Sequence, residues 1–266
     1  MNRRQRRTAA RTAGGRAALS YADQYTCPDC ASDTELRRDD DGVSPGRAPR
    51  RHVSHLSAHT WWCVMLYALD TLDRLVTATP GAVGRCRGCG AALTPKCGPL
   101  VAHHWAHRSG DCDRWAEPDS AWHLAWQACA PADRTEVPIG NHRADIITPD
   151  GRVVEVQHSH LPVADIAARE AHYGRMAWLW DAREAYEAER LTLNPRATWT
   201  GFRWKHPRKS IASCRRPVFL DLDGVRLLRV RKFHQSERFA GWGTVASADD
   251  FRRWLGQPST VERTAA

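Results

Sequence analysis

Residues 142–159, HRADIITPDGRVVEVQHS, constrain the fold more than any other part of the sequence. Two apolar runs flank the tripeptide Pro-Asp-Gly at 149–151, which suits a three-residue hairpin loop. Proline fits the first turn position, and glycine fits the left-handed position that forms a G1 bulge. If the residues on either side of this loop face each other, the pairing register is fixed and Asp145 lies opposite Glu155. The segment therefore predicts a β-hairpin in which two acids lie directly opposite each other on neighbouring strands.

The two faces of this hairpin differ in chemistry. Side chains alternate along a strand, so Arg143 and Gln157 share a face with the two acids. The opposite face carries Ala144, Ile146, Val154 and Val156, which are typical of a protein core. Facing carboxylates have Cβ atoms about 5 Å apart and repel each other. A bound Mg²⁺ or Mn²⁺ would neutralise them, because hard cations prefer oxygen ligands. The alternative is an exposed face on which arginines balance two solvated acids.

The segments around the hairpin predict the element order α-β-β-β-α-β. Apolar residues at helical spacing predict one helix over 120–130 and another over 163–173, which Gly174 closes. Strand-like alternation marks residues 135–139, 142–148, 152–159 and 175–181. Another hairpin is predicted over 217–233, with its turn at Asp223-Gly224, whereas residues 183–210 have no clear pattern. This order predicts an α/β fold.

The chain divides into four predicted parts. We expect a basic, disordered tail over residues 1–25, a zinc-binding region over 26–115, the domain with the two acids over 116–256, and a C-terminal tail over 257–266. Apolar spacing also predicts a helix over 59–78, HTWWCVMLYALDTLDRLVTA. With 42% hydrophobic residues and 12 tryptophans, the chain can build a real core.

The cysteines favour a metal site over a disulfide framework. Nine cysteines are an odd number, we expect no secretory signal, and two CxxC pairs are typical of zinc sites. The spacing in residues 86–112 predicts a structural zinc with the ligands Cys86, Cys89, His107 and Cys112, and His104 is the alternative fourth ligand. A second site at Cys27, Cys30, His52 and His55 stays open, because the loop between these pairs is long and charged.

Four of these segments together resemble a known family. Residues 117–126 (EPDSAWHLAW), 142–146 (HRADI), 153–159 (VVEVQHS) and 169–174 (RExxYG) look like the nuclease domain of the CoiA-like competence protein family. That family is a branch of the PD-(D/E)XK nuclease superfamily. The resemblance covers residues 84–256 and implies an αβββαβ core with a zinc-binding module in front of it. The order predicted above from periodicity is the same.

The resemblance also implies roles for single residues. It assigns divalent metal binding to Asp145 and Glu155, and it places Gln157 where most superfamily members have a catalytic lysine. Glu117 stands where members often have another acid. The implied reaction is phosphodiester hydrolysis with a metal-activated water, which Gln157 would orient while Arg143 offsets negative charge. A glutamine amide supplies no positive charge to the transition state. The alternative is therefore a protein with the same fold that does not cut nucleic acid.

Several helical residues have both a functional and a structural interpretation. The resemblance places Arg169, Glu170 and Tyr173 beside the cleft, and His123 lies on the helix that follows Glu117. An ordinary ion pair, a packed tyrosine and a structural histidine are the alternatives.

Charge and hydropathy narrow the choice of partner. The net charge of +9 and the pI of about 9.4 favour a polyanion, nucleic acid first. No apolar run approaches the length of a membrane helix, so we expect a soluble, cytoplasmic protein without a membrane partner. The leading hypothesis is a Mg²⁺-dependent DNA nuclease in DNA uptake, recombination or defence. The alternatives are a zinc-containing nucleic-acid-binding protein that does not cut and an adaptor that binds recombination proteins.

Overall fold

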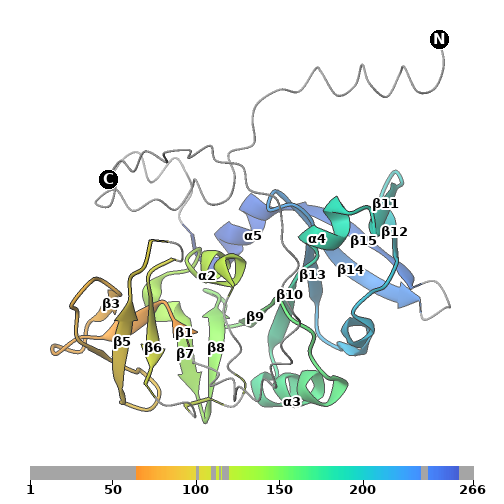
Figure 1. Ribbon diagram of the computed structural model, residues 1–266. Coiled ribbons are helices and arrows are strands. Elements are labelled where there is room, and N and C mark those ends of the chain that lie inside the picture. Colours follow the sequence, from red (N-terminus) through yellow and green to blue (C-terminus); the bar gives the residue numbers. More distant parts are fainter. Residues whose placement is uncertain are drawn as a thin grey trace, which may run out of the picture. The chain divides into compact units, whose positions relative to one another are not determined.

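Two β-sheets dominate the computed structural model, which describes residues 64–99, 102–108, 112–113, 115, 120–234 and 239–257 (Figure 1). All of these residues belong to one compact unit. The fold is α/β, mostly strand with few helices. One sheet has six strands in the order β1-β6-β5-β4-β2-β3, and the other has nine in the order β11-β12-β15-β14-β13-β10-β9-β8-β7.

The six-stranded sheet is built from short antiparallel strands. They are β1 (Val64–Met65), β2 (Tyr67–Leu69), β3 (Leu75–Thr77), β4 (Gly84–Arg85), β5 (Ala92–Lys96) and β6 (His104–His107). Its small core consists of the buried side chains of Met65, Ala68, Leu93 and Trp105, with Cys86 beside them. These short strands present little apolar surface, so a metal site would be a natural additional source of stability.

The helix predicted over residues 59–78 is wrong in the part that the structure describes, because residues 64–77 contain β1, β2 and β3. The Asp70 carboxylate accepts the backbone N–H groups of Leu72 and Arg74, at 2.8 and 2.9 Å. Such local bonds between an aspartate and the backbone compete with the helix. Asp73, with a φ of 60°, then helps to reverse the chain so that β2 and β3 pair.

The predicted order α-β-β-β-α-β is present in the nine-stranded region. It consists of α2 (Ala121–Gln127), β7 (Thr135–Ile139), β8 (His142–Ile147), β9 (Val153–Gln157), α3 (Val163–Tyr173) and β10 (Met176–Asp181), with a 3-10 helix (Ala132–Arg134) before β7. Ser120 caps α2 by accepting the His123 N–H, and Gly174 ends α3 with a φ of 62°. These elements coincide with the predicted segments apart from a few end residues.

The C-terminal elements extend the same sheet. The predicted hairpin is present as β13 (Val218–Asp221) and β14 (Arg226–His234), and Gly224 in its turn has a φ of 77°. The segment without a clear sequence pattern contains α4 (Arg183–Glu187), β11 (Leu191–Pro195), β12 (Thr200–Trp204) and a 3-10 helix (Lys209–Ser213). The chain then forms β15 (Ala240–Ser247) and α5 (Ala248–Leu255).

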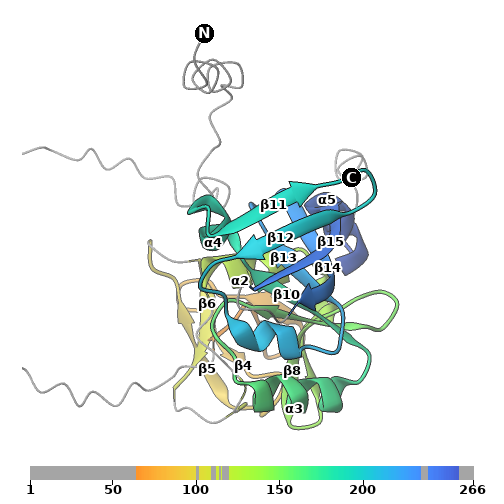
Figure 2. The same cartoon turned by 90° about the vertical axis from the view of Figure 1, so that its right-hand side faces the viewer.

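Helices cover both faces of the central strands β9, β10 and β13, which run parallel (Figures 1 and 2). On one face, Ile166 of α3 belongs to the core that includes Trp178 and Trp180. On the other face, α2 and α5 pack against side chains of β8, β9 and β10 through residues that include Trp122 and Phe251. Neighbouring residues of β9 and β10 therefore point into different environments.

The hairpin register agrees with the prediction. Ile146 pairs with Val154, and the Thr148 N–H donates to the Arg152 carbonyl oxygen at 2.9 Å. Gly151 has the positive φ (78°) that the loop requires. Continuing this register by one residue places Asp145 opposite Glu155. Regular pairing ends there, because an Asp145 carboxylate oxygen accepts the Val156 N–H at 2.8 Å.

Candidate functional site

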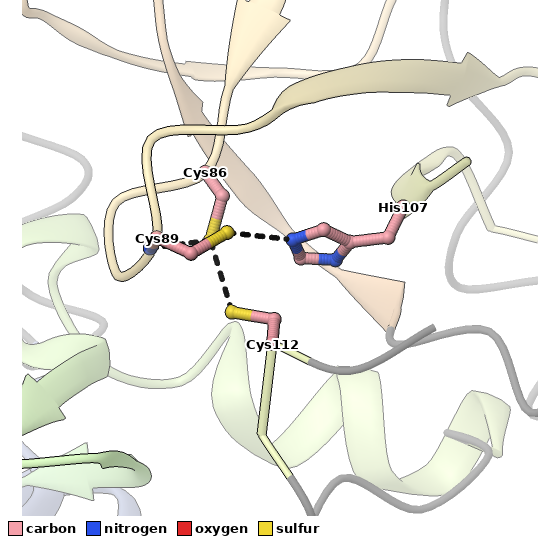
Figure 3. Close-up of side chains that lie close together, drawn as sticks. All are labelled: Cys86, Cys89, His107 and Cys112. Atoms are coloured by element: carbon pink, nitrogen blue, oxygen red, sulfur yellow. Dashed lines mark hydrogen bonds between the residues drawn. The ribbon is translucent and has the colours of Figure 1, made fainter. Parts of the chain in front are cut away.

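A group of metal-ligating side chains lies at the turn between β4 and β5 and beside β6 (Figure 3). It consists of Cys86, Cys89, His107 and Cys112, whose donor atoms all lie within 4.8 Å of one another. The Cys89 Sγ is 3.3 Å from His107 Nε2, and the Sγ atoms of Cys86 and Cys112 are 3.5 Å apart. Three thiols and one imidazole are a common ligand set for structural zinc. This cluster, as predicted, could hold a zinc ion.

The electrostatics of the cluster also fit a cation. Burial acts to raise the pKa of the Cys86 thiol, but hydrogen bonds from His107 and from the backbone of Cys89 and Gly88 bring it down to about 6. Burial and the charge of Cys86 raise the pKa of Cys112 far above its usual range. Ionisation of the Cys86 thiol is therefore favoured, whereas ionisation of the Cys112 thiol beside it is opposed. A bound dication would remove the repulsion between the two thiolates.

The structure distinguishes between the two histidines that the sequence left open. His104 and His107 are three residues apart on β6, so their side chains point to opposite faces of the sheet. The Nδ1 of His104 lies 2.8 Å from the Ala102 carbonyl oxygen, and His107 joins the cysteines. The second predicted site, at Cys27, Cys30, His52 and His55, lies outside the described residues.

The two acids of the hairpin meet where β8 and β9 separate. Glu155 Oε1 lies 3.5 Å from the Asp145 backbone nitrogen. Glu155 is only 2% exposed, and Asp145 is half-buried. The two carboxyl groups are thus neighbours in a largely buried environment.

Each acid has a partner on a different helix. Arg169 of α3 forms an ion pair with Glu155 at 2.8 Å and also donates to the Trp115 carbonyl oxygen at 2.9 Å. His123 Nε2 of α2 lies 3.1 Å from Asp145 Oδ1, and Gln127 of the same helix donates to that oxygen at 3.2 Å. Both helices therefore position the hairpin acids.

These environments move the two carboxyl pKa values in opposite directions. Burial, and then the charge of Asp145, raise the pKa of Glu155 to about 7 against the opposing effect of Arg169. Burial also acts to raise the pKa of Asp145, but the nearby His123 and the Val156 N–H lower it below its usual value. Near neutral pH, Glu155 therefore titrates beside an ionised Asp145. Carboxyl pairs perturbed in this way occur frequently at functional sites.

Tyr173 of α3 contributes a polar atom to the same region. Burial, followed by the charges of Glu155 and Asp145, raises the pKa of its phenol. Its hydroxyl is buried and has no hydrogen-bond partner among the residues that the structure describes. A buried hydroxyl without a partner costs free energy, so a ligand or water that bonds to it would be favoured.

The remaining predicted site residues have other contacts. Gln157 is buried, and its amide donates to Ser159 at 3.1 and 3.3 Å. Arg143 donates through its guanidinium to the Val64 carbonyl oxygen at 3.0 Å. Glu170 accepts the Trp178 indole N–H and the backbone N–H groups of residues 215 and 216, which is a structural role. Glu117 lies outside the described residues.

Sequence patterns did not reveal the acids that connect the six-stranded sheet and the cysteine–histidine cluster to β7 and β8. Asp113, one residue after Cys112, accepts the His142 ring and the Arg143 backbone N–H, both at 2.8 Å. Glu136 accepts the N–H groups of residues 66 and 67, at 2.9 and 3.2 Å. Such contacts between distant segments carry no periodic signal; only the position of Asp113 beside a predicted ligand was a hint.

Neither a protein family, nor a curated protein, nor a solved structure matches this chain. Among the helices in the described part of the chain, none has the length and hydrophobicity needed to span a bilayer.

Proposed function

We propose that this chain is a Mg²⁺- or Mn²⁺-dependent nuclease that hydrolyses DNA, with a PD-(D/E)XK-type core in α2, β7, β8, β9, α3 and β10. The observation that carries the proposal is the interior pairing of Asp145 and Glu155: Glu155 is buried, and its Oε1 lies 3.5 Å from the Asp145 backbone nitrogen. Burial, and then the charge of Asp145, raise the pKa of Glu155 to about 7. Two adjacent carboxylates need a compensating charge when both are ionised. Mg²⁺ typically takes one or two carboxylates and leaves its other positions to water and substrate phosphates. The net charge of +9 supports a nucleic-acid substrate.

Each nearby side chain has a defined role in this proposal. Asp145 and Glu155 would hold the metal ion, which supplies Lewis acidity and a water of lowered pKa. Arg169 and His123 keep the two carboxylates in place. The Tyr173 hydroxyl can donate to a phosphate oxygen, and Gln157 would orient the attacking water. The cluster at Cys86 would hold structural zinc and take no part in the chemistry.

One observation favours a second candidate. The ion pair between Arg169 and Glu155 at 2.8 Å already supplies one positive charge without a metal ion. With Gln157 in place of the superfamily's lysine, the same fold suits a zinc-containing protein that binds nucleic acid and does not cut it. DNA uptake, recombination and defence are compatible settings for either candidate.

A cleavage assay on labelled single- and double-stranded DNA separates the two. The purified protein is tested without added divalent ions, with Mg²⁺ and with Mn²⁺; EDTA is avoided because it would also extract zinc. Cleavage should require the added ion. It should fall by at least about a hundredfold in Glu155→Gln and Asp145→Asn, the loss typical of removing one positioned charged group.

A matched control makes the same chemical change elsewhere. Glu184→Gln also converts a carboxylate to an amide, but the Glu184 side chain is exposed on α4, where it pairs with Arg190, so cleavage should stay at the wild-type rate. Thermal unfolding shows whether each variant is folded. Metal-independent cleavage, or cleavage that survives in both folded acid variants, would reject the proposal; DNA binding without cleavage by the wild type would favour the second candidate.

A further inference from the structure

A groove lies on the sheet face that α5 borders, away from the two acids. Its volume is about 530 Å³, and the residues used below are Asp150, Arg152, Phe219, Arg229, Asp250 and Trp254. Ala177 of β10 also lines it, whereas the next residue, Trp178, packs on the face of α3. Because side chains alternate, the groove and Glu155 are on opposite faces of the sheet.

The two acids of the groove pair with arginines that do not line it, although the charge of Arg152 also acts on Asp150. Asp150 accepts the Arg175 guanidinium at 3.0 Å, and Asp250 pairs with Arg253. In the described part of the chain, Arg152 and Arg229 form no ion pair. Burial, followed by the charges of Arg231 and Arg152, lowers the pKa of Arg229. The groove therefore holds clustered positive charge that an anion would relieve.

Aromatic rings form the other wall of the groove. The Arg229 guanidinium lies 5.9 Å from the centre of the Phe219 ring, and the Phe219 and Trp254 ring centres are 6.0 Å apart. Both aromatic residues are half-buried. Arginines next to aromatic rings suit the two parts of a nucleotide: the phosphate pairs with arginine, and the base stacks on an aromatic ring. In a duplex the base faces are stacked on one another, so this wall favours a single strand.

We propose that this groove binds single-stranded nucleic acid, with a backbone phosphate between Arg152 and Arg229 and a base against Phe219 and Trp254. The proposal takes its substrate class from the proposed function, but it does not require cleavage. Arg152 immediately precedes β9 and comes three residues before Glu155, which is roughly 10 Å along the extended chain, but its side chain lies on the opposite face of the sheet.

Fluorescence anisotropy with a labelled oligo-dT tests the groove. Affinity is measured for the full chain without added divalent ions, and a gel confirms that the oligonucleotide stays intact. The double variant Arg152→Gln/Arg229→Gln should bind at least about tenfold more weakly. Its log affinity should also depend less steeply on log salt, by about 0.7 units, since each phosphate contact on a single strand contributes about 0.7.

A second double variant controls for net charge. Arg215→Gln/Arg216→Gln removes the same charge from two exposed residues outside the groove and should retain most of the affinity. Equal losses in the two double variants would overturn the proposal, as would an unchanged affinity in Arg152→Gln/Arg229→Gln. Trp254→Leu should weaken binding of oligo-dT but not of an abasic oligonucleotide, and an equal effect on both probes would reject the stacking contact.

The experiments can reject the nuclease proposal and the groove proposal independently of each other. If the protein binds oligo-dT through the groove but never cuts DNA, the nuclease proposal is rejected and the groove stands. If metal-dependent cleavage needs Glu155 while the groove variant binds normally, the nuclease stands and the groove proposal is rejected.

Discussion

Glu155 decides how the acid pair responds to pH. Its pKa of about 7 means that a divalent ion at this site must displace a proton in much of the physiological range. We expect Mn²⁺ affinity to rise about tenfold per pH unit between pH 5.5 and 7 and to level off above that. Calorimetric titration of the zinc-loaded protein, in buffers of different ionisation enthalpy, measures both the affinity and the released proton.

Arg169 provides the control for this prediction, because its charge opposes the upward shift of the Glu155 pKa. Arg169→Gln should move the levelling point to higher pH, and Arg169→Lys, which keeps the charge, should stay close to the wild type. A Mn²⁺ affinity that is constant from pH 5.5 to 7.5 would contradict the assignment. In the metal-free protein a rising pH lowers stability instead. The contribution of Glu155 to the free energy of unfolding is complete below about pH 4.5, the ordinary pKa of a glutamate, and is lost as pH rises through about 7.

At the residue scale, the sequence predicted the two acids, and the resemblance named Arg169 and His123 as candidates, but it gave neither their ion pairs with the acids nor the role of Gln127. Asp145 and Glu155 followed from turn chemistry, because three loop residues fix the register of the hairpin. His123, Gln127 and Arg169 reach the acids only because α2 and α3 dock on the sheet. Docking depends on cores assembled from distant segments, which local periodicity does not encode.

At the scale of elements, the loop between β8 and β9 should be sensitive to a single methyl group. Gly151 has a φ of 78°, and an added Cβ would meet no atom within 4 Å, so strain alone opposes a side chain there. Gly151→Ala should lower the free energy of unfolding by about 1–2 kcal/mol. Gly98→Ala, which meets no atom either and has no positive φ, should change it by less than about 0.5 kcal/mol. Chemical denaturation measures both, and equal effects would contradict a left-handed Gly151.

Elements with their own turn and cap signals were predictable, and those without them were not. β8, β9 and α3 are bounded by Gly151 and Gly174, whose positive φ values match their sequence context. Residues 59–78 have helical spacing, yet β1 and β2 take partners in β6 and β4, which follow later in the chain. Similarly, β12 pairs with β15, which follows much later in the chain, and β11 pairs with β12. Long-range pairing decides between helix and strand where local signals conflict.

At the scale of the whole molecule, hydrogen bonds connect the cysteine–histidine cluster to the strand that carries Asp145. Cys112 belongs to the cluster, and the next residue, Asp113, bonds His142 and the Arg143 backbone at the start of β8. Arg87, inside the CxxC turn, donates to the carbonyl oxygens of residues 133 and 135 just before and within β7. A structural metal that orders the turn would therefore also hold one end of the hairpin.

Cys112→Ser should consequently lose one zinc per chain and loosen the region around β4, β5 and β6 first. Hydrogen exchange followed by mass spectrometry should show faster exchange in these strands and at the start of β8, while β9 and β10, which are buried throughout, remain protected. DNA cleavage should fall even though Asp145 and Glu155 are intact. Cys214→Ser, a thiol outside the cluster, should keep its zinc and its exchange pattern. Unchanged exchange at the start of β8 after zinc loss would show that the metal supports only its own sheet.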